Sequence, residues 1–299
     1  MDQYVPVAFL AALGIAANAV LTKVILRYRV CSSSLVGWLS ATGSGVCAAV
    51  VVGLTGRAFP MAAWPWLAGL AVATILALLA LATALQEADV STVVPVMGVK
   101  IPLTAVLAAL FLGENHPPSV YVAVVLAAAA VALFGLGHQS RAQGGRGRHP
   151  LYGISMAVAA STCYAVSDQF AKAAIDRSDP LTVLLWLWIV VGAVCFGVSR
   201  RGVYRQYKIT PRDGALLVAN GALALGAIGC LFWSFDLANG VTVPNIIFGT
   251  RGFFALFAGA LLNQFLPLPF EKQTRAIYSL RVAGTLLMFI SILVGVLAR

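Results

Sequence analysis

One basic, glycine-rich segment interrupts an otherwise apolar chain: His138-Gln-Ser-Arg-Ala-Gln-Gly-Gly-Arg-Gly-Arg-His-Pro150. It is the longest polar gap inside the sequence, and apolar stretches recur on both sides of it. A helix needs about 20 apolar residues to cross a bilayer, and five such stretches precede the segment and five follow it. These stretches are approximately Tyr4–Leu26, Ser34–Leu54, Pro65–Leu85, Val90–Leu112, Ser119–Gly137, Leu151–Ile175, Leu181–Ser199, Gly214–Phe235, Val241–Leu262 and Val282–Ala298. The sequence therefore predicts an all-α integral membrane protein with ten transmembrane helices.

The overall composition leads to the same class of protein. Of the 299 residues, 61% are apolar and only 10% are charged, whereas roughly a quarter of the residues in soluble domains are charged. Because so few charges would not cover a water-facing surface, a soluble enzyme is nearly excluded, and the chain is also too apolar to be disordered. The five cysteines and three histidines show no metal-binding spacing, so we expect no metal and no cofactor.

The two halves of the chain resemble each other. A shift of 149 residues superposes them without a gap over the first four spans. The polar and proline residues that coincide are Pro95 with Pro244, Glu87 with Asp236, and Lys23 with Lys172. Apolar sequence matches itself easily, so these three coincidences at one offset carry the argument for an internal repeat.

The repeat fixes the expected domain organisation. Residues 1–137 form the first five-helix repeat, residues 138–150 the linker, and residues 151–299 the second five-helix repeat. Because five is odd, the second repeat must enter the membrane from the opposite side. Inverted repeats are typical of secondary transporters, in which the substrate site lies near the membrane midplane between the halves.

Loop charges predict the orientation. Thirteen basic residues lie in the loops after odd-numbered spans, whereas the loops after even-numbered spans and the termini hold only Arg57, Arg177 and Arg299. Since cytoplasmic loops collect Lys and Arg, both termini are expected outside the cell membrane (the inner membrane if the source is bacterial). The net charge of +10 is thus explained by topology, and no nucleic-acid partner is expected. The expected partners are a small-molecule substrate and the lipid bilayer, with the protein a monomer or weak homodimer.

Four basic residues lie within the expected spans: Lys23, Lys100, Lys172 and Arg251. A charge at the centre of a membrane helix costs about 2.5–3.5 kcal/mol on insertion scales, so it marks a functional site by default. Lys100 and Arg251 lie near the middle of the fourth and ninth spans, and together they suit an anionic substrate. The alternative is that each cation pairs with Asp168 or with an acid at a span end.

Helix-breaking residues surround these two positions, namely Pro95, Pro102, Pro244, Gly249 and Gly252. They are candidate hinges, because interrupted helices are tolerated in a membrane where the freed backbone lines a cavity.

Five further residues complete the candidate site. Asp168 and Lys172 are spaced to pair on one helix face, and Asp168 is alternatively a proton-coupling residue. Lys23 is either a coupling residue or a lysine whose side chain reaches the membrane surface. Asn18 and Thr22 share a helix face, where they either line the cavity or hydrogen-bond to a neighbouring helix. Trp233 is a candidate for stacking on the substrate.

Two stretches of the first half carry recognisable family motifs: Ala84-Leu-Gln-Glu-Ala-Asp-Val-Ser-Thr-Val-Val-Pro95 and Leu103-Thr-Ala-Val-Leu-Ala-Ala-Leu-Phe-Leu-Gly-Glu114. They resemble the drug/metabolite transporter superfamily, EamA-domain type. In the second half, Trp233-Ser-Phe-Asp-Leu-Ala-Asn-Gly-Val-Thr-Val-Pro244 fits the same pattern, but Leu262-Asn263 stands where the first half has Gly113-Glu114. Members of this superfamily usually keep both termini in the cytoplasm, whereas the loop charges of this chain predict the reverse.

The resemblance also bears on the two central cations. Lys100 and Arg251 are similar to the basic positions that triose-phosphate and nucleotide-sugar translocators use for phosphate, which implies that they are anion ligands. The leading hypothesis is a secondary transporter that moves a small polar, anionic metabolite by alternating access. The alternatives are an exporter of amino acids or of cationic or aromatic compounds that uses Asp168, and a structural or sensory membrane protein. No catalytic constellation and no ATP-binding GxxxxGK[ST] motif occurs, so we expect no enzyme.

Overall fold

The computed structural model describes residues 3–28, 33–87, 93, 96–139, 150–202, 210–254 and 275–297. Within these ranges the chain is helical and contains no strand. The helices are α1 (Tyr4–Tyr28), α2 (Ser33–Thr55), α3 (Trp64–Glu87), α5 (Lys100–Leu107), α6 (Pro118–Gln139), α7 (Pro150–Ile175), α8 (Pro180–Gly202), α9 (Pro211–Leu237), α10 (Thr242–Phe248) and α12 (Arg275–Leu297), with short η1 (Met61–Ala63), η2 (Met97–Val99) and η3 (Ala108–Leu112) segments.

These helices coincide with the stretches expected from the sequence. The predicted span Ser34–Leu54 corresponds to α2, and the predicted span Gly214–Phe235 corresponds to α9. Five described helical segments are long and apolar enough to cross a membrane. They are Tyr4–Thr22, Leu35–Thr55, Met61–Glu87, Pro180–Ser199 and Pro211–Leu237. The all-helical membrane architecture is therefore confirmed, whereas a total of ten spans stays a prediction.

Proline and a capping box begin several of the helices. α6, α7, α8 and α9 each start at a proline, whose fixed φ and missing N–H suit the first helical position. At α9 the Thr210 side chain accepts a hydrogen bond from the Asp213 N–H, while the Asp213 carboxylate accepts one from the Thr210 N–H. These four helices therefore begin at local sequence signals.

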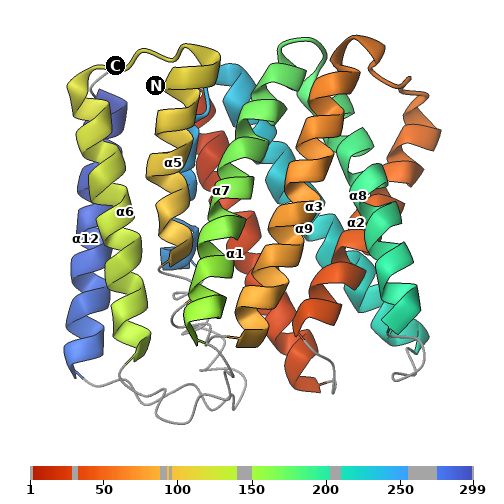
Figure 1. The fold of residues 1–299 in the computed structure, drawn as a ribbon, viewed down its shortest axis with the longest axis horizontal. Coiled ribbons are helices and arrows are strands. Elements are labelled where there is room, and N and C mark those ends of the chain that lie inside the picture. Colours follow the sequence, from red (N-terminus) through yellow and green to blue (C-terminus); the bar gives the residue numbers. More distant parts are fainter. Residues whose placement is uncertain are drawn as a thin grey trace.

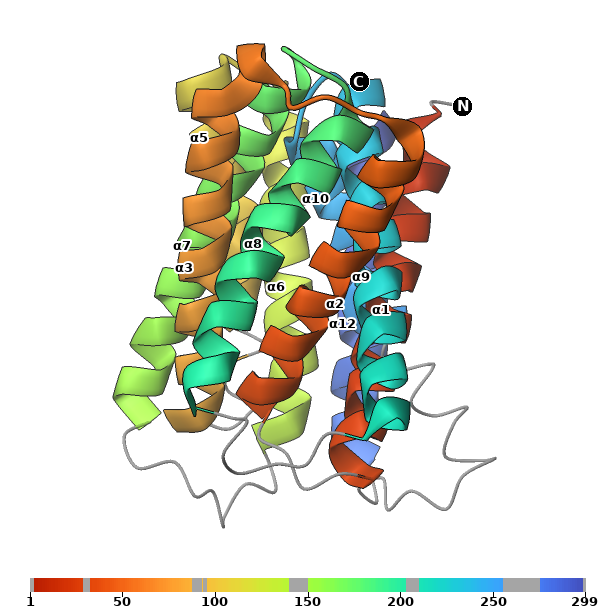
Figure 2. The ribbon, with the colours of Figure 1, turned by 90° about the vertical axis from the view of Figure 1, so that its right-hand side faces the viewer.

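The helices run side by side as one bundle, and both marked chain ends lie at the same end of it (Figure 1). The most extensive packing joins elements of opposite halves: α3 with α7, α1 with α9, α2 with α8, and α6 with α12. Figure 2 shows α8 lying across the bundle beside α2 and α3, both of which it contacts. The interior is therefore shared between the halves.

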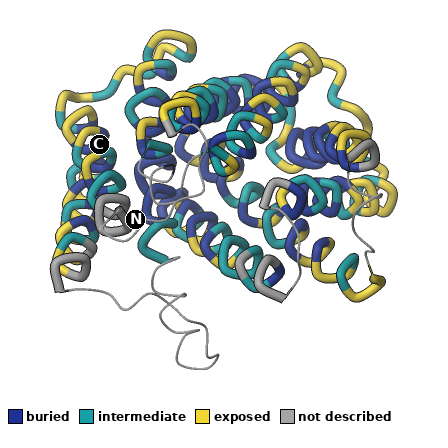
Figure 3. Tube along the Cα trace, turned by 60° about the horizontal axis from the view of Figure 1, so that its bottom comes forward, coloured by how far each residue is buried: buried dark blue, intermediate teal, exposed yellow. Residues whose placement is uncertain are grey.

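Burial follows the pattern expected in lipid. Figure 3 shows buried residues gathered inside the bundle and exposed residues on its outer faces. Many of the exposed side chains are large and apolar, among them Leu10, Val50, Leu76, Leu110 and Phe289. In water such a surface would be an interaction or aggregation site. In a bilayer the same surface faces apolar lipid chains.

Glycine permits the closest crossing between the halves. A Cβ atom on Gly192 of α8 would lie 2.7 Å from the Cα atom of Gly45 on α2. A Cβ atom on Gly221 of α9 would lie 2.4 Å from the backbone nitrogen of Ser44. Because lipid supplies no hydrophobic drive between helices, such backbone-to-backbone packing is a main source of their association.

Candidate functional site

The ninth predicted span is interrupted, as its glycines indicate. α10 ends at Phe248, Gly249 and Thr250 form a turn, and residues 251–254 are helical again. A Cβ atom at position 249 would lie 3.0 Å from the Ile246 carbonyl oxygen, so a larger residue would crowd this turn. Arg251 therefore begins a new helical turn just beyond the break.

The fourth predicted span has a matching irregularity. The 3₁₀ segment η2 precedes α5, which begins at Lys100. Pro102 is the third residue of α5, and Pro244 is the third residue of α10. Proline in a first helical turn replaces an N–H that has no intrahelical partner; the role of both prolines as hinges stays a prediction. Pro95 lies outside the described residues.

Lys100 joins the two halves through a buried ion pair. Its Nζ lies 2.8 Å from Oδ2 of Asp168 on α7, and both side chains are less than a tenth exposed. The same Nζ donates a hydrogen bond of 3.1 Å to Oδ1 of Asn245 on α10. Lys100 therefore follows the alternative predicted from the sequence, in which a central cation pairs with Asp168.

Arg251 lies against the other side of the same cluster. Its Cζ is 4.7 Å from the centre of the Phe248 ring, and Lys100 Nζ is 5.8 Å from that centre. The structure therefore brings the two predicted cations together around one aromatic ring. In the described part of the chain Arg251 forms no ion pair. One positive charge of the cluster consequently has no carboxylate partner there.

Buried polar atoms without partners lie next to this ion pair. Thr104 is one turn beyond Lys100 on α5, and Gln169 follows Asp168 on α7. The Gln169 amide nitrogen donates to the Thr104 carbonyl oxygen at 3.2 Å. Among the described residues, neither the Thr104 hydroxyl nor Gln169 Oε1 has a hydrogen-bond partner. Each such buried atom costs about 1–3 kcal/mol of stability, so these two need an explanation.

Lys172 does not pair with Asp168, as the helical spacing had suggested. Lys172 instead forms an ion pair with Asp176, which is four residues further along the chain. It also donates a hydrogen bond of 3.0 Å to Oδ1 of Asn239. The packing of α7 against α5 places Asp168 beside Lys100 instead. Lys172 thus belongs to the end of the bundle and not to the central cluster.

Asn18 and Thr22 hydrogen-bond to a neighbouring helix. Asn18 Nδ2 donates to Asn220 Oδ1 at 2.9 Å, and Asn220 Nδ2 donates to the Thr22 hydroxyl at 3.0 Å. Asn220 also donates to the Ser40 hydroxyl. This network links α1, α2 and α9, and it corresponds to the interhelical alternative for the two residues.

The remaining predicted site residues lie apart from the cluster or outside the description. Trp233 is 58% exposed, so it is not enclosed with Lys100. The side chain of Lys23 is outside the described residues, although its backbone belongs to α1. Gly252 lies in the helical turn that begins at Arg251.

Sequence reasoning missed four neutral residues of the cluster: Thr104, Gln169, Asn245 and Phe248. A neutral polar or aromatic residue inside an apolar span costs far less than a charge, so it stands out weakly. The available signal was the position of Asn245 and Phe248 within α10, just before the helix break.

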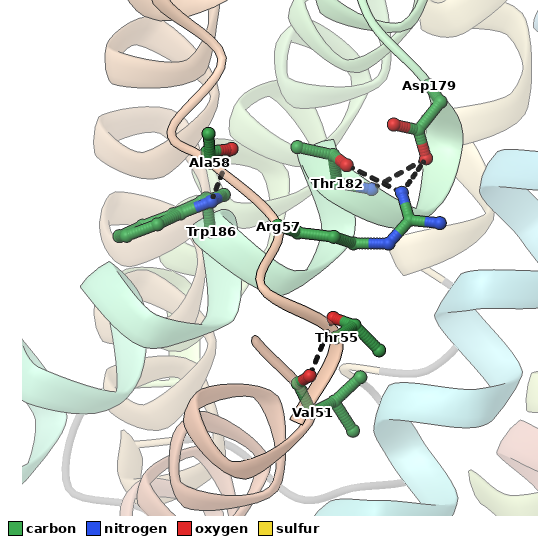
Figure 4. Close-up of polar contacts among 7 residues, drawn as sticks. All are labelled: Val51, Thr55, Arg57, Ala58, Asp179, Thr182 and Trp186. Atoms are coloured by element: carbon green, nitrogen blue, oxygen red, sulfur yellow. Dashed lines mark hydrogen bonds and ion pairs between the residues drawn. The ribbon is translucent and has the colours of Figure 1, made fainter. Parts of the chain in front are cut away.

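The end of the bundle that carries both chain ends has its own polar contacts (Figures 1 and 4). Figure 4 shows the Arg57 guanidinium pointing at Asp179, with a nitrogen-to-oxygen distance of 2.7 Å, and at the Thr182 hydroxyl. Trp186 donates its indole N–H to the Ala58 carbonyl oxygen. Partial burial raises the pKa of Asp179, but hydrogen bonds from Thr182 and the charge of Arg57 outweigh it and lower that pKa.

A separate cavity of about 440 Å³ opens between α3 and α7. Gly69, Val72, Leu76, Val166 and Phe170 line most of it, and none of them belongs to the cluster around Lys100. It is apolar, so it offers nothing to orient a polar solute. Among the described residues, no group of three or more His, Cys, Asp or Glu side chains is placed to hold a metal ion.

The fold and the buried cluster together define a multi-pass helical membrane protein with charged groups in its interior. Residues 3–136 match the model of the EamA-like transporter family, which confirms the resemblance to the EamA-type drug/metabolite transporter superfamily. The first half of the chain therefore resembles an EamA-like transporter domain, a type of domain found in membrane transporters of small solutes.

The whole chain also matches a solved structure. That structure, named "Crystal structure of protein", superposes with a TM-score of 0.77 at 15% sequence identity, and the match covers 100% of this chain and 97% of the other. At this identity the likeness concerns the fold alone. No curated protein matches the sequence.

Proposed function

We propose that the protein is a secondary transporter that moves a small anionic solute across the membrane by alternating access. In this account ten helices span the bilayer as two inverted five-helix repeats, and the solute binds between the halves at the cluster around Lys100 and Arg251. The termini lie outside the cell, as the loop charges indicate.

The charge balance of the cluster carries the proposal. Lys100 is neutralised by Asp168 at 2.8 Å, whereas Arg251 forms no ion pair in the described part of the chain and lies against the Phe248 ring, with Tyr164 and Asp168 close enough to interact with its charge. A cation within a membrane span that has no ionic partner is costly. A carboxylate or phosphate group of the solute would supply that partner, and a guanidinium can bind either one through two parallel hydrogen bonds.

The unpartnered atoms beside the ion pair further limit which solutes would fit the site. Gln169 Oε1 is an acceptor only, so its missing partner must be a donor. The Thr104 hydroxyl both donates and accepts. A solute that carries a hydroxyl or amino group in addition to its anionic group would satisfy both residues as well as Arg251.

The packing pattern supports an inverted repeat. A shift of 149 residues relates α1 to α7 and α3 to α9, so exchanging the halves turns the α3–α7 contact into the α9–α1 contact. Both contacts are among the most extensive in the bundle. The α2–α8 contact maps onto itself under the same exchange, and α6 and α12, the last helices of the two halves, also pack against each other. This is the arrangement that rocking of one repeat against the other requires.

A cation exporter that uses Asp168 is the competing function. Asp168 would then have to bind the solute with its carboxylate, but Lys100 already occupies one oxygen of that carboxylate. Because Asp168 pairs with Lys100, the positive charge of Arg251 would repel a cation. The structure thus favours an anionic solute over a cationic one.

Uptake by the full-length protein in liposomes tests the proposal. We expect the wild-type protein to transport at least one solute from a panel of small hydroxy acids, amino acids and sugar phosphates. Arg251→Gln should lower that rate by about tenfold or more, as expected for loss of a hydrogen bond to a charged group. Arg251→Lys should retain part of the activity. The control is Arg212→Gln, an exposed arginine at the start of α9, which should change nothing.

The opposite result is equally specific. If the wild-type protein transports only organic cations, and if Asp168→Asn abolishes that transport while Arg251→Gln leaves it intact, the cation exporter is the correct function.

A further inference from the structure

The connector between α9 and α10, residues 238–241, is held by a carboxylate from the other half of the chain. Glu114 Oε1 accepts a hydrogen bond of 2.6 Å from the Val241 backbone N–H, and its Oε2 accepts one of 2.7 Å from the Thr242 hydroxyl. α10 has no side-chain cap of its own, since Val241 precedes it. Glu114 therefore does the work of an N-cap for a helix more than a hundred residues away.

The site of this contact is built closely around the carboxylate. The Glu114 side chain is 8% exposed and lies 2.8 Å from His116 Nε2. Glu114 follows Gly113, whose φ of 67° ends the η3 segment in the left-handed conformation. A Cβ atom at Gly240 would lie 2.8 Å from Glu114 Oε1, so the connector approaches the carboxylate as closely as a glycine allows.

A second contact holds the connector from the opposite side. Asn239 adopts a left-handed backbone with φ of 48°, and its Oδ1 accepts the hydrogen bond from Lys172. Lys172 belongs to the same half as the connector, so the hydrogen bonds of Glu114, together with the apolar packing of Ala238, link the connector to the first half.

The held connector leads directly into the candidate solute site. One turn after Val241, the backbone N–H of Asn245 donates to the Val241 carbonyl oxygen at 3.1 Å, and the Asn245 amide donates to it at 2.9 Å. Asn245 Oδ1 in turn accepts from Lys100. Every residue of α10 is buried. We therefore expect this short helix to move as one unit with its first turn.

We propose that Glu114 is a positioning residue that fixes α10 against the first half, so that closure of this end of the bundle and assembly of the solute site are one event. This proposal rests on the proposed transport function. The hydrogen bonds of Glu114 on which it is built are observed independently of that function. When Glu114 releases Val241 and Thr242, α10 is free to withdraw Asn245 from Lys100 and to open a path from this end to the site.

Cysteine labelling of the full-length protein tests the proposal without any solute. The five native cysteines are replaced by serine or alanine, and Val243→Cys is introduced at a fully buried position of α10. We expect this thiol to react slowly with a small water-soluble maleimide. Adding Glu114→Gln should speed the reaction by about tenfold or more, because hydrogen bonds to an ionised group are among the stronger ones. Glu114→Asp, which keeps the carboxylate, should restore part of the protection.

The matched control is Asp213→Asn. Asp213 also caps a helix with its carboxylate, but it lies at the start of α9 and has no contact with α10 that the structure shows. If Glu114→Gln leaves the labelling rate unchanged, or if Asp213→Asn raises it equally, the proposal is wrong. Failure of the anion-transport proposal would show in uptake and not in these rates, so the two outcomes are distinguishable.

Discussion

The Lys100 ammonium nitrogen lies 2.8 Å from a carboxylate oxygen of Asp168, and this pair connects the two halves of the chain inside the bundle. Neither residue reaches water, since both side chains are less than a tenth exposed. A buried pair of this kind contributes less to stability than its separation suggests, because both charges were first removed from water. The pair affects stability most when one partner is replaced, because the other charge then stays buried without it.

Removing one partner should be far more harmful than removing both. Lys100→Met leaves the Asp168 carboxylate buried without its ion-pair partner, which should lower the free energy of unfolding by about 3–5 kcal/mol. The double variant Lys100→Met with Asp168→Leu removes both charges and should recover most of the loss. Unfolding in detergent solution is measured for the wild type, for Lys100→Met and Asp168→Leu alone, and for the double variant. A double variant as unstable as the sum of its single variants would show that the two residues act independently.

The glycine crossing of α2 and α8 makes a second prediction. Gly192→Ala places a methyl group against the backbone of Gly45 and Ala41, so the halves must move apart. We expect a loss of about 1–3 kcal/mol, as for other overpacked sites. Gly197→Ala on the same helix meets nothing within 4 Å and should be neutral or slightly stabilising. Equal unfolding temperatures for the two variants would contradict the crossing.

The contact between Arg57 and Asp179 should depend on pH. Because the pKa of Asp179 is lowered in the folded protein, its contribution is present above the ordinary Asp value of about 3.9 and is lost as the pH falls through the lower folded value. The contribution is at most about 1 kcal/mol, since the pair is 34% and 50% exposed. Asp179→Asn should therefore be slightly less stable than wild type at pH 7 and equally stable at the most acidic pH. A difference that grows on acidification would refute this assignment.

The orientation in the membrane can be measured directly. In a background without native cysteines, Gln3→Cys should react with a membrane-impermeant maleimide added to intact cells, because the loop charges place the N-terminus outside. Gly144→Cys, in the linker, should react only after the membrane is permeabilised. The reverse pattern would mean that the orientation usual in the superfamily holds for this chain.

Much of the fold was predictable because membrane helices have a simple sequence pattern. Runs of about 20 apolar residues gave the positions of helices such as α2 and α9, and prolines marked several of their starts. The break after Phe248 was predictable from Gly249, since glycine disfavours a helix interior.

The pairing of charges was not predictable in the same way. The i,i+4 spacing predicted a pair between Lys172 and Asp168. The packing of α7 against α5 instead places Asp168 beside Lys100, and Lys172 pairs with Asp176. Glu114 was visible as part of a family motif, but its partners Val241 and Thr242 lie in the other half of the chain. Long-range contacts of this kind depend on tertiary packing, which a pattern along one helix does not record.

Solute binding to the purified protein is the most direct test of the account. A ligand that binds only the folded state raises its stability by mass action, by about 2.7 kcal/mol at a hundred times its Kd. We expect at least one small hydroxylated or aminated anion to raise the unfolding temperature of the wild-type protein and of Arg212→Gln, and to leave Arg251→Gln unchanged. A stabilising anion that acts equally on Arg251→Gln, or stabilisation by cations alone, would contradict the assignment of this site to an anionic solute.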